Sequence, residues 1–253
     1  MFRVEELTKR FNGIRALDRC TFAVSSNTIT GIVGPNGAGK TTLFDVVTGF
    51  VAADTGSVYF RDRNIAGLPP HAVARLGVAR TFQLLRLYRD LSVIDNLLLA
   101  RWSVALPLLM KTLMSPSRLS SAEYQLRSEC RLLLEQVGLI DKFSALAGEL
   151  SYGQQKVLEI IRAMIANPVL FLFDEPAAGL DPSMKRAVGD LIRGLKEQGR
   201  TVILIEHDLG FVRDLCDQVV VLDQGAPIFI GNPEALPGDP LVRDRYLSKG
   251  AYL

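Results

Sequence analysis

The chain has 253 residues, of which 48% are hydrophobic and 22% are charged, and its formal net charge is +2. This composition is ordinary for a globular protein with a large core, and the length suits a single domain with two lobes. The lysines and arginines are spread along the chain rather than gathered in runs, which excludes a strongly basic surface for nucleic acid.

The sequence also predicts the compartment of the protein. Cys20, Cys130 and Cys216 are far apart and lack metal-site spacing, so we expect free thiols in a reducing compartment. The N-terminus is polar from its third residue, which argues against a signal peptide. The apolar stretches 104–110 and 169–173 are far shorter than the about 20 residues that span a bilayer. We therefore expect a water-soluble chain that reaches a membrane only through a partner.

The first quarter of the chain predicts strands around a glycine-rich loop. Residues 3–11, 16–24 and 56–65 have the pattern of strands that are exposed on one face. Residues 29–34 form a short apolar strand that runs directly into the loop, and a helix is expected at 41–50. This order of strand, loop and helix places the loop at the end of a buried strand.

The middle of the chain, from about 84 to 166, is expected to be mainly helical. One helix starts after Ser92, which is a good N-cap residue. A second has leucines at helical spacing and stops at Gly138. We found no repeats and no long linker in this region.

The last third returns to strands. Residues 169–175 and 201–208 are nearly continuous apolar runs, which suit parallel strands buried on both faces, with a helix between them at 182–198. A hairpin is expected at 219–230. The predicted fold class is α/β: a core with a mainly parallel sheet, an antiparallel β subdomain and an inserted helical subdomain at about 87–165.

The glycine-rich loop carries the strongest motif. Residues 34–41, GPNGAGKT, match G-x-x-x-x-G-K-[ST] between a predicted strand and a helix. Backbone N–H groups of such a loop and the helix N-terminus bind phosphate oxygens, the lysine bridges the β- and γ-phosphates, and the threonine hydroxyl holds Mg²⁺. The sequence therefore predicts a nucleoside triphosphate site. Its expected residues are Gly34, Pro35, Asn36, Gly37, Ala38, Gly39, Lys40, Thr41 and Thr42.

Two acids and a histidine are expected near this loop. Asp174 and Glu175 end a buried strand and, as strand neighbours, should point to opposite faces. Asp174 is the candidate Mg²⁺ ligand, and Glu175 can polarise the water that attacks the γ-phosphate. His207 ends the next parallel strand at the same sheet edge and can hold that water. The expected catalytic set is Lys40, Glu175 and His207. The alternative for Asp174 and Glu175 is an acidic turn that only caps the strand.

These motifs together resemble the ATP-binding subunit of ABC transporters. They are GPNGAGKTT, Gln83, LSYGQQ, FLFDEP, AGLD at 178–181 and His207, and the resemblance covers essentially the whole chain. It implies a single ABC ATP-binding domain with a P-loop NTPase core at 1–86 and 166–253 and a helical subdomain at 87–165. The segments LSYGQQ and DEPAAGLDP are similar to the corresponding segments of one ATPase of the branched-chain (hydrophobic) amino-acid importers.

The resemblance also implies roles that the residues alone would not give. Phe11 matches an aromatic that stacks on adenine, although it could simply pack a strand. Gln83 matches a residue whose amide ligates Mg²⁺ and lies where the helical subdomain contacts membrane-spanning subunits. Asp181 matches a loop that reaches the opposite ATP-binding subunit. The apolar segment 105–114 is either a docking surface or helix core.

LSYGQQK at 150–156 has two interpretations. Ser151 and Gln154 form a capping box at the start of an amphipathic helix. The resemblance implies instead that Ser151, Gly153 and Gln154 contact the γ-phosphate held by the other subunit, aided by the helix dipole. The two uses of the serine hydroxyl conflict in part. Tyr152 stands where the wider family most often has glycine.

The resulting hypothesis is a transport ATPase that uses ATP and Mg²⁺ at the cytoplasmic face of the membrane. Its expected partners are a second ATP-binding subunit, either a copy or a different chain, transmembrane permease subunits and, indirectly, a solute-binding protein, with no nucleic acid. The cargo expected is branched-chain or other hydrophobic amino acids. The alternatives are an ATPase of a lipid or lipopolysaccharide exporter and a non-transport ABC ATPase.

Overall fold

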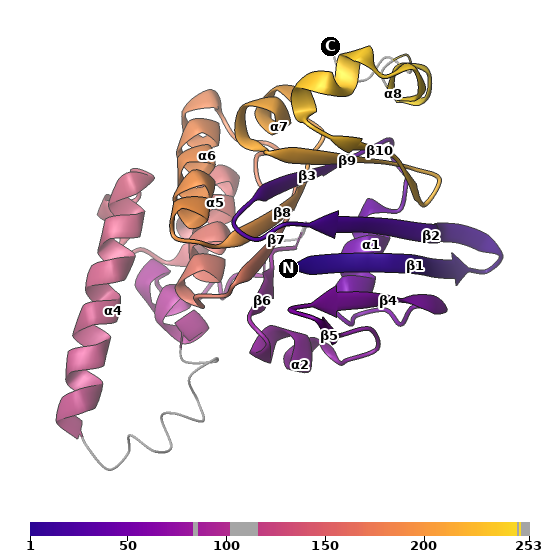
Figure 1. Cartoon of the computed structure of the whole chain (residues 1–253). Coiled ribbons are helices and arrows are strands. Elements are labelled where there is room, and N and C mark those ends of the chain that lie inside the picture. The colour runs from indigo at the N-terminus through magenta and orange to yellow at the C-terminus, as the bar shows by residue number, and fades with distance from the viewer. Residues whose placement is uncertain (83–85, 102–115, 247, 249–253) are drawn as a thin grey trace. The chain divides into compact units, whose positions relative to one another are not determined.

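The computed structural model describes residues 1–82, 86–101, 116–246 and 248 (Figure 1). Two of the predicted features lie outside the described residues: Gln83 and the apolar segment 105–114. The chain divides into two compact units. The core unit comprises Met1–Arg80, Val169–Ala178 and Ile192–Leu253, and the helical unit comprises Thr81–Pro168 and Gly179–Leu191.

A six-stranded sheet in the core unit positions the phosphate loop and the strand-end acids. Its order is β10-β9-β3-β8-β7-β6, and all neighbouring pairs are parallel except the hairpin β9–β10. The predicted parallel strands and the predicted C-terminal hairpin are thus confirmed. The strands are β3 (Ile29–Val33), β6 (Val78–Arg80), β7 (Leu170–Asp174), β8 (Thr201–Ile205), β9 (Gln218–Asp223) and β10 (Ala226–Gly231).

The register of this sheet aligns three strand ends. Asp174 of β7 pairs with Ile205 of β8, and Ile205 pairs with Ile32 of β3. Every residue of β3, β7 and β8 is buried, as expected for parallel strands that are covered on both faces. The segments that follow these strands therefore emerge at one edge of the sheet.

An antiparallel sheet completes the core unit, with strand order β2-β1-β4-β5 (Figure 1). Its strands are β1 (Phe2–Phe11), β2 (Ile14–Val24), β4 (Thr55–Phe60) and β5 (Arg63–Asn64). The single strand predicted at 56–65 is wrong, because β4 and β5 form a hairpin. Arg61 and Asp62 turn the chain with φ values of 49° and 62°, the left-handed conformation of a two-residue hairpin loop.

Helices of the core unit flank the two sheets. They are α1 (Lys40–Val47), α2 (Pro70–Arg75), α7 (Leu209–Leu215) and α8 (Pro240–Arg245), with a 3₁₀ helix η3 (Pro233–Gly238). One hydrophobic core contains Val4 of β1, Phe44 of α1 and Leu172 of β7, so α1 packs with both sheets. This packing stabilises the helix that follows the phosphate loop.

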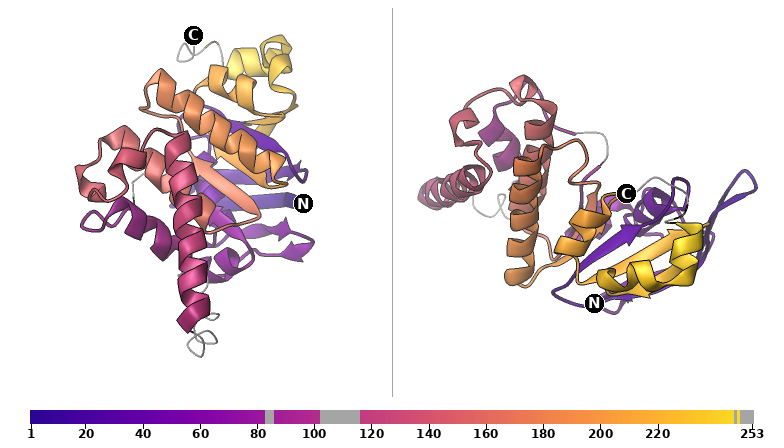
Figure 2. Two further views of the ribbon diagram at one scale, coloured as in Figure 1. Left: turned by 90° about the vertical axis from the view of Figure 1, so that its left-hand side faces the viewer. Right: turned by 90° about the horizontal axis from the view of Figure 1, so that it is seen from above.

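The helical unit contains α4 (Pro116–Gln136), α5 (Tyr152–Ile165) and the 3₁₀ helices η1 (Ile140–Lys142) and η2 (Ala147–Glu149). Helix α4 is the long helix of Figure 2 and contacts α5.

Residues 93–101 are also helical, and the Asp95 N–H donates to the hydroxyl of Ser92, which confirms the predicted cap. Gly138 follows α4 with φ of 67°, as its predicted stop requires. Helix α6 (Pro182–Glu197) begins in this unit and ends in the core unit.

None of the helices that the structure describes is long and apolar enough to cross a membrane.

A pair of glycine substitutions tests how closely β4 approaches β1. Gly56 and Gly13 both have positive φ, 92° and 88°, so alanine introduces strain of about 1 kcal/mol or more at either position. At Gly56 the new Cβ would also lie 2.5 Å from the Glu6 carbonyl oxygen, whereas no described atom lies within 4 Å at Gly13. We expect Gly56→Ala to lower the Tm more than Gly13→Ala in thermal unfolding followed by circular dichroism. Equal losses would contradict the close approach.

Candidate functional site

The phosphate loop is wedged between two strands. A Cβ on Gly34 would lie 2.1 Å from the Leu222 carbonyl oxygen of β9, and one on Gly39 would lie 2.2 Å from the Ala16 carbonyl oxygen of β2. Only glycine fits at these two positions. In the described structure no side chain caps α1, so the first N–H groups of this helix are left to bind an anion.

Lys40 is the first residue of α1, and its side chain extends back over the loop. Its ammonium donates to the carbonyl oxygens of Gly34 at 2.7 Å and Pro35 at 2.9 Å. Burial lowers the pKa of Lys40, and the nearby carboxylates of Glu175 and Asp174 oppose that shift. The loop thus holds a buried cation beside two acids, which is the charge pattern that a phosphate chain complements.

The sequence predicted that Asp174 and Glu175 are strand neighbours on opposite faces, and this prediction is wrong. Strand β7 ends at Asp174, and Glu175 adopts φ of 52°, while its N–H donates to the Ile205 carbonyl oxygen at 2.9 Å. A non-glycine residue in this conformation is strained by about 1–3 kcal/mol, and such strain clusters at functional sites. The direction of the Glu175 carboxylate is therefore set by a turn and not by the pleat of the strand.

His207 lies against Glu175 two residues beyond β8, which ends at Ile205, so the prediction that His207 itself ends the strand is wrong. Its Nε2 is 3.1 Å from Oε1 of Glu175, and both side chains are partly exposed. The contact joins the ends of β7 and β8 at one edge of the sheet. A carboxylate that is oriented by an imidazole beside a phosphate loop is a group that can direct a water molecule.

Glu206 belongs to this edge, although sequence reasoning missed it. Its side chain is buried, and Oε1 accepts from the Ala177 N–H at 2.7 Å, while Oε2 accepts from the His207 N–H at 3.2 Å. Glu206 thereby fixes the turn after Glu175 to the end of β8. The only signal in the sequence was an acid directly after the apolar run 201–205.

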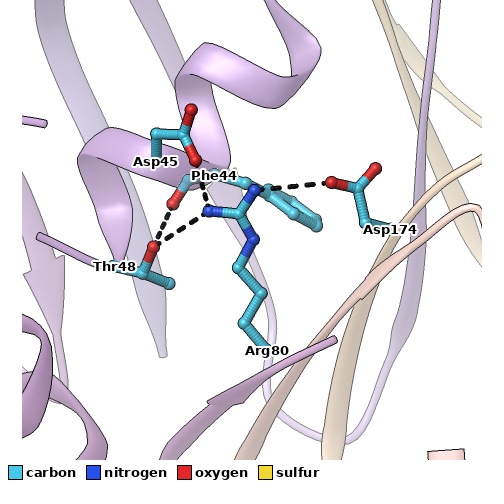
Figure 3. A network of polar contacts seen from close by, with 5 residues as sticks. All are labelled: Phe44, Asp45, Thr48, Arg80 and Asp174. Carbon is cyan, nitrogen blue, oxygen red and sulfur yellow. Dashed lines mark hydrogen bonds and ion pairs between the residues drawn. The ribbon is translucent and has the colours of Figure 1, made fainter. Parts of the chain in front are cut away.

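Arg80 is a second residue that sequence reasoning missed. It ends β6, and its guanidinium contacts Asp45 of α1, the C-cap residue Thr48 and Asp174 of β7 (Figure 3). Burial raises the pKa of Asp174, and the Arg80 charge opposes that shift. A single arginine after a short apolar strand gives no sequence signal for such contacts.

Phe11 ends β1 just before the turn to β2, and the residue is 43% exposed. The Lys9 ammonium is 5.3 Å from the centroid of this ring. The ring is thus presented to solvent and not packed in the core. Its exposed face is available for stacking.

The segment 151–154 of the helical unit starts α5 with the predicted capping box. The Gln154 N–H donates to the Ser151 hydroxyl at 3.3 Å, and the Ser151 N–H donates to the Gln154 side chain at 3.0 Å. A Cβ on Gly153 would lie 3.1 Å from the Met184 sulfur of α6, so α5 and α6 approach closely here. Ser151 and Tyr152 are exposed at the surface of this unit.

Asp181 caps the neighbouring helix α6. Its carboxylate accepts from the N–H and hydroxyl of Ser183 at 2.9 and 2.5 Å and from the Met184 N–H at 3.1 Å. The hydrogen bond from the Ser183 hydroxyl, followed by that from Met184, lowers the pKa of Asp181. The starts of α5 and α6 meet where the Tyr152 ring lies near Gly179, 3.5 Å from the place of an added Cβ.

Comparison with known proteins decides the family. The model of the ABC transporter family matches residues 17–178. This chain belongs to the ABC transporter family. The high-affinity branched-chain amino acid transport ATP-binding protein LivG of Escherichia coli K12 is 36% identical over 250 residues, which cover 98% of both chains. BraF of Pseudomonas aeruginosa, described in the same words, is 38% identical with the same coverage.

Solved structures agree with this family. A nucleotide-free ATP-binding cassette from an ABC transporter has a TM-score of 0.82 and 32% identity, covering 97% of this chain and 98% of that one. The ADP conformation of an ATP-binding cassette of an ABC transporter has a TM-score of 0.80 and 32% identity, covering 98% of both. The predicted family and the predicted fold class are confirmed.

The ABC transporter family explains the loop chemistry. The chain is an ATP-binding subunit of this family and hydrolyses ATP. The residues of the core unit fit the triphosphate, because the uncapped start of α1 supplies N–H donors and Lys40 supplies the positive charge.

The capping box predicts separate effects of two serine substitutions. Ser151→Ala removes the acceptor for the Gln154 N–H, so we expect it to lower the free energy of unfolding by about 1 kcal/mol. Ser151→Asp keeps an acceptor of similar capping strength and should stay close to wild type. Urea denaturation followed by circular dichroism measures both. A Ser151→Asp variant as unstable as Ser151→Ala would contradict the capping role.

Proposed function

We propose that this ABC transporter ATPase powers the uptake of branched-chain or other hydrophobic amino acids. It works as one of two ATP-binding subunits, a pair of copies or two different chains, bound to transmembrane permease subunits at the cytoplasmic face of the membrane, with a solute-binding protein delivering the cargo. The assignment of the cargo rests on the similarity to LivG and BraF over 98% of each chain. Both are branched-chain amino acid transport proteins.

Each nucleotide is held mainly by the core unit. The adenine stacks on the exposed ring of Phe11, and the loop from Gly34 to Thr42 surrounds the phosphates. The Lys40 ammonium exchanges its loop carbonyl partners for the β- and γ-phosphates, which carry more negative charge. These contacts leave the γ-phosphate near the ends of β7 and β8.

The donor set also fits Mg²⁺. Thr41, at the exposed start of α1, and Asp174 supply hard oxygen ligands, and Gln83, outside the described residues, is a further candidate. No group of three His, Cys, Asp or Glu side chains that could form a protein-only metal site occurs among the described residues. This suits Mg²⁺, which keeps water and substrate phosphates among its ligands. When bound, it neutralises charge on the phosphates.

Hydrolysis uses the Glu175–His207 pair. Glu175 accepts a proton from the water that attacks the γ-phosphate, and His207 orients Glu175 and that water. The strained backbone of Glu175 and its hydrogen bond to Ile205 support this assignment, because they fix where the carboxylate can point. Lys40 stabilises the charge that develops on the transferred phosphoryl group.

The helical unit serves the nucleotide of the second ATP-binding subunit. Ser151, Gly153 and Gln154 face its γ-phosphate from the start of α5, and Asp181 lies in the loop that reaches the partner. Capping uses a lone pair of the Ser151 hydroxyl, whereas a hydroxyl also has a proton to donate. The capping box and the phosphate contact are therefore compatible. Residues 87–165, which belong to the helical unit, transmit closure of this pair to the permease.

A substitution of the proposed base tests the mechanism. Glu175→Gln keeps the shape of the side chain and removes the proton acceptor, so we expect ATP turnover to fall about 10²–10⁴-fold. The ATP-bound pair should persist, because binding does not need the base. Turnover is measured by phosphate release and pairing by size-exclusion chromatography with ATP. The matched control is Glu234→Gln, an exposed acid at the start of η3. Near-wild-type turnover of Glu175→Gln, with no persistent pair, would refute the role.

A transport assay tests the cargo. The ATPase is reconstituted in proteoliposomes with the permease subunits and solute-binding protein encoded beside its gene, and uptake of radiolabelled leucine and isoleucine is measured. We expect ATP-dependent uptake of these amino acids and no uptake of lysine. ATP turnover that responds only to lipid or lipopolysaccharide would favour the exporter alternative. A gene neighbourhood without permease genes would favour a non-transport ABC ATPase.

A further inference from the structure

We propose that Arg80 and Asp45 are positioning residues that set how readily Asp174 binds the metal ion. Arg80 holds the Asp174 carboxylate, and Asp45 limits how closely Arg80 engages it. The inference rests on the proposed Mg²⁺ role of Asp174. It assigns a function to two residues that do not themselves contact the nucleotide in the mechanism above.

Arg80 connects the C-terminal end of the phosphate-binding helix α1 to the end of β7. Its Nη1 lies 2.6 Å from Oδ1 of Asp45 on α1 and 3.2 Å from the hydroxyl of Thr48, the C-cap residue of α1. Its Nη2 lies 3.4 Å from Oδ2 of Asp174. Figure 3 shows the guanidinium between the two acids, with the Phe44 ring beside it. The guanidinium carbon Cζ lies 5.6 Å from the centroid of that ring.

The guanidinium is fixed in place by α1. The Thr48 hydroxyl donates to the Phe44 carbonyl oxygen at 2.5 Å, which orients its lone pairs to accept from Arg80. Arg80 has a planar fork of donors, so a position set by Asp45 and Thr48 at one nitrogen also sets the position of the other. The contacts of Nη1 with Asp45 and Thr48 therefore help to set where Nη2 lies opposite Asp174.

Burial makes these charges depend on one another. The side chains of Arg80 and Asp174 are only 5% and 4% exposed, whereas Asp45 is 32% exposed. Burying one charge without a partner is strongly unfavourable, so Arg80 offsets the burial of Asp174. A pair at 2.6 Å is much tighter than one at 3.4 Å, and Asp45 holds the tighter one. Asp174 is thus supported by a positive charge without being locked to it.

This division of charge predicts the behaviour of the metal site. A carboxylate that is loosely hydrogen-bonded to a cation keeps its orientation and can still exchange toward a divalent ion. Without Arg80, Asp174 loses a charged partner that orients it. Without the Asp45 charge, the guanidinium is free to move closer to Asp174 and compete with the metal. Both changes should weaken metal binding, and the effect of Asp45 should require Arg80.

The experiment measures Mg²⁺ affinity without using turnover. A fluorescent ATP analogue is bound to the protein in EDTA, and Mg²⁺ is then titrated to obtain the apparent Mg²⁺ affinity of the nucleotide complex. Partners that orient metal ligands typically contribute about 10–100-fold to metal affinity, so we expect a loss of that size for Arg80→Gln and a smaller loss for Asp45→Asn. The double variant should match Arg80→Gln alone, because Asp45 acts through Arg80.

Nucleotide affinity in EDTA and the Tm separate positioning from folding. A merely structural role would lower the Tm, the affinity in EDTA and the Mg²⁺ affinity together, whereas positioning lowers the Mg²⁺ affinity selectively. Asp45→Asn keeps Arg80 and alters a partly exposed side chain, so it remains informative if Arg80→Gln does not fold. Arg245→Gln is the matched control: Arg245 also lies 3.4 Å from a buried strand-end acid, Asp223, and its loss should leave Mg²⁺ affinity unchanged.

The outcomes distinguish this inference from the proposed function. If Mg²⁺ does not change nucleotide affinity in the wild type, or if Asp174→Asn retains the full Mg²⁺ effect, the metal role of Asp174 is wrong. If Asp174→Asn abolishes the Mg²⁺ effect while Arg80→Gln and Asp45→Asn preserve it, only the positioning role is overturned. Additive losses in the double variant would show that Asp45 acts independently of Arg80 and would overturn its part.

Discussion

The chemistry of this protein depends on the parallel pairing of β3, β8 and β7 in one register. Because Asp174 is level with Ile205 and Ile205 with Ile32, the loop after β3 and the turns after β8 and β7 leave the sheet at one edge. A shift of one residue in β7 would take Asp174 out of this level and turn its side chain to the other face of the sheet. The place of the strand-end groups is thus fixed by packing far from the nucleotide.

Buried charges at this edge are all arranged against partners. Lys40 donates to loop carbonyl oxygens, Glu206 accepts from two backbone N–H groups, and Asp174 faces Arg80. Removing water makes an uncompensated charge expensive, and the same low dielectric strengthens every interaction with a phosphate. The fixed partners of Glu206 and Asp174 limit the rearrangement of this edge during the reaction, while Lys40 exchanges its partners for phosphate.

The sequence predicted the parts that depend on local pattern. The phosphate loop, the parallel strands, the capping box and the two acids follow from glycine spacing, apolar runs and helix-start residues, which act over a few positions. It failed where distant segments or unusual conformations decide. Arg80 reaches Asp174 only because β6 pairs with β7, and the left-handed Glu175 and the Arg61–Asp62 turn lack the glycine or asparagine that usually marks such backbone.

The starts of α5 and α6 differ in a way that bears on which of them can meet a phosphate. Asp181 caps α6 with a carboxylate, which only accepts hydrogen bonds and would repel an anion. Ser151 caps α5 with a hydroxyl, which accepts from Gln154 and can donate its own proton in another direction. Since a helix N-terminus attracts negative charge, a neutral cap leaves that attraction intact and a carboxylate cap cancels much of it. This contrast supports assigning the phosphate contact to Ser151 and a role in orienting the loop to Asp181.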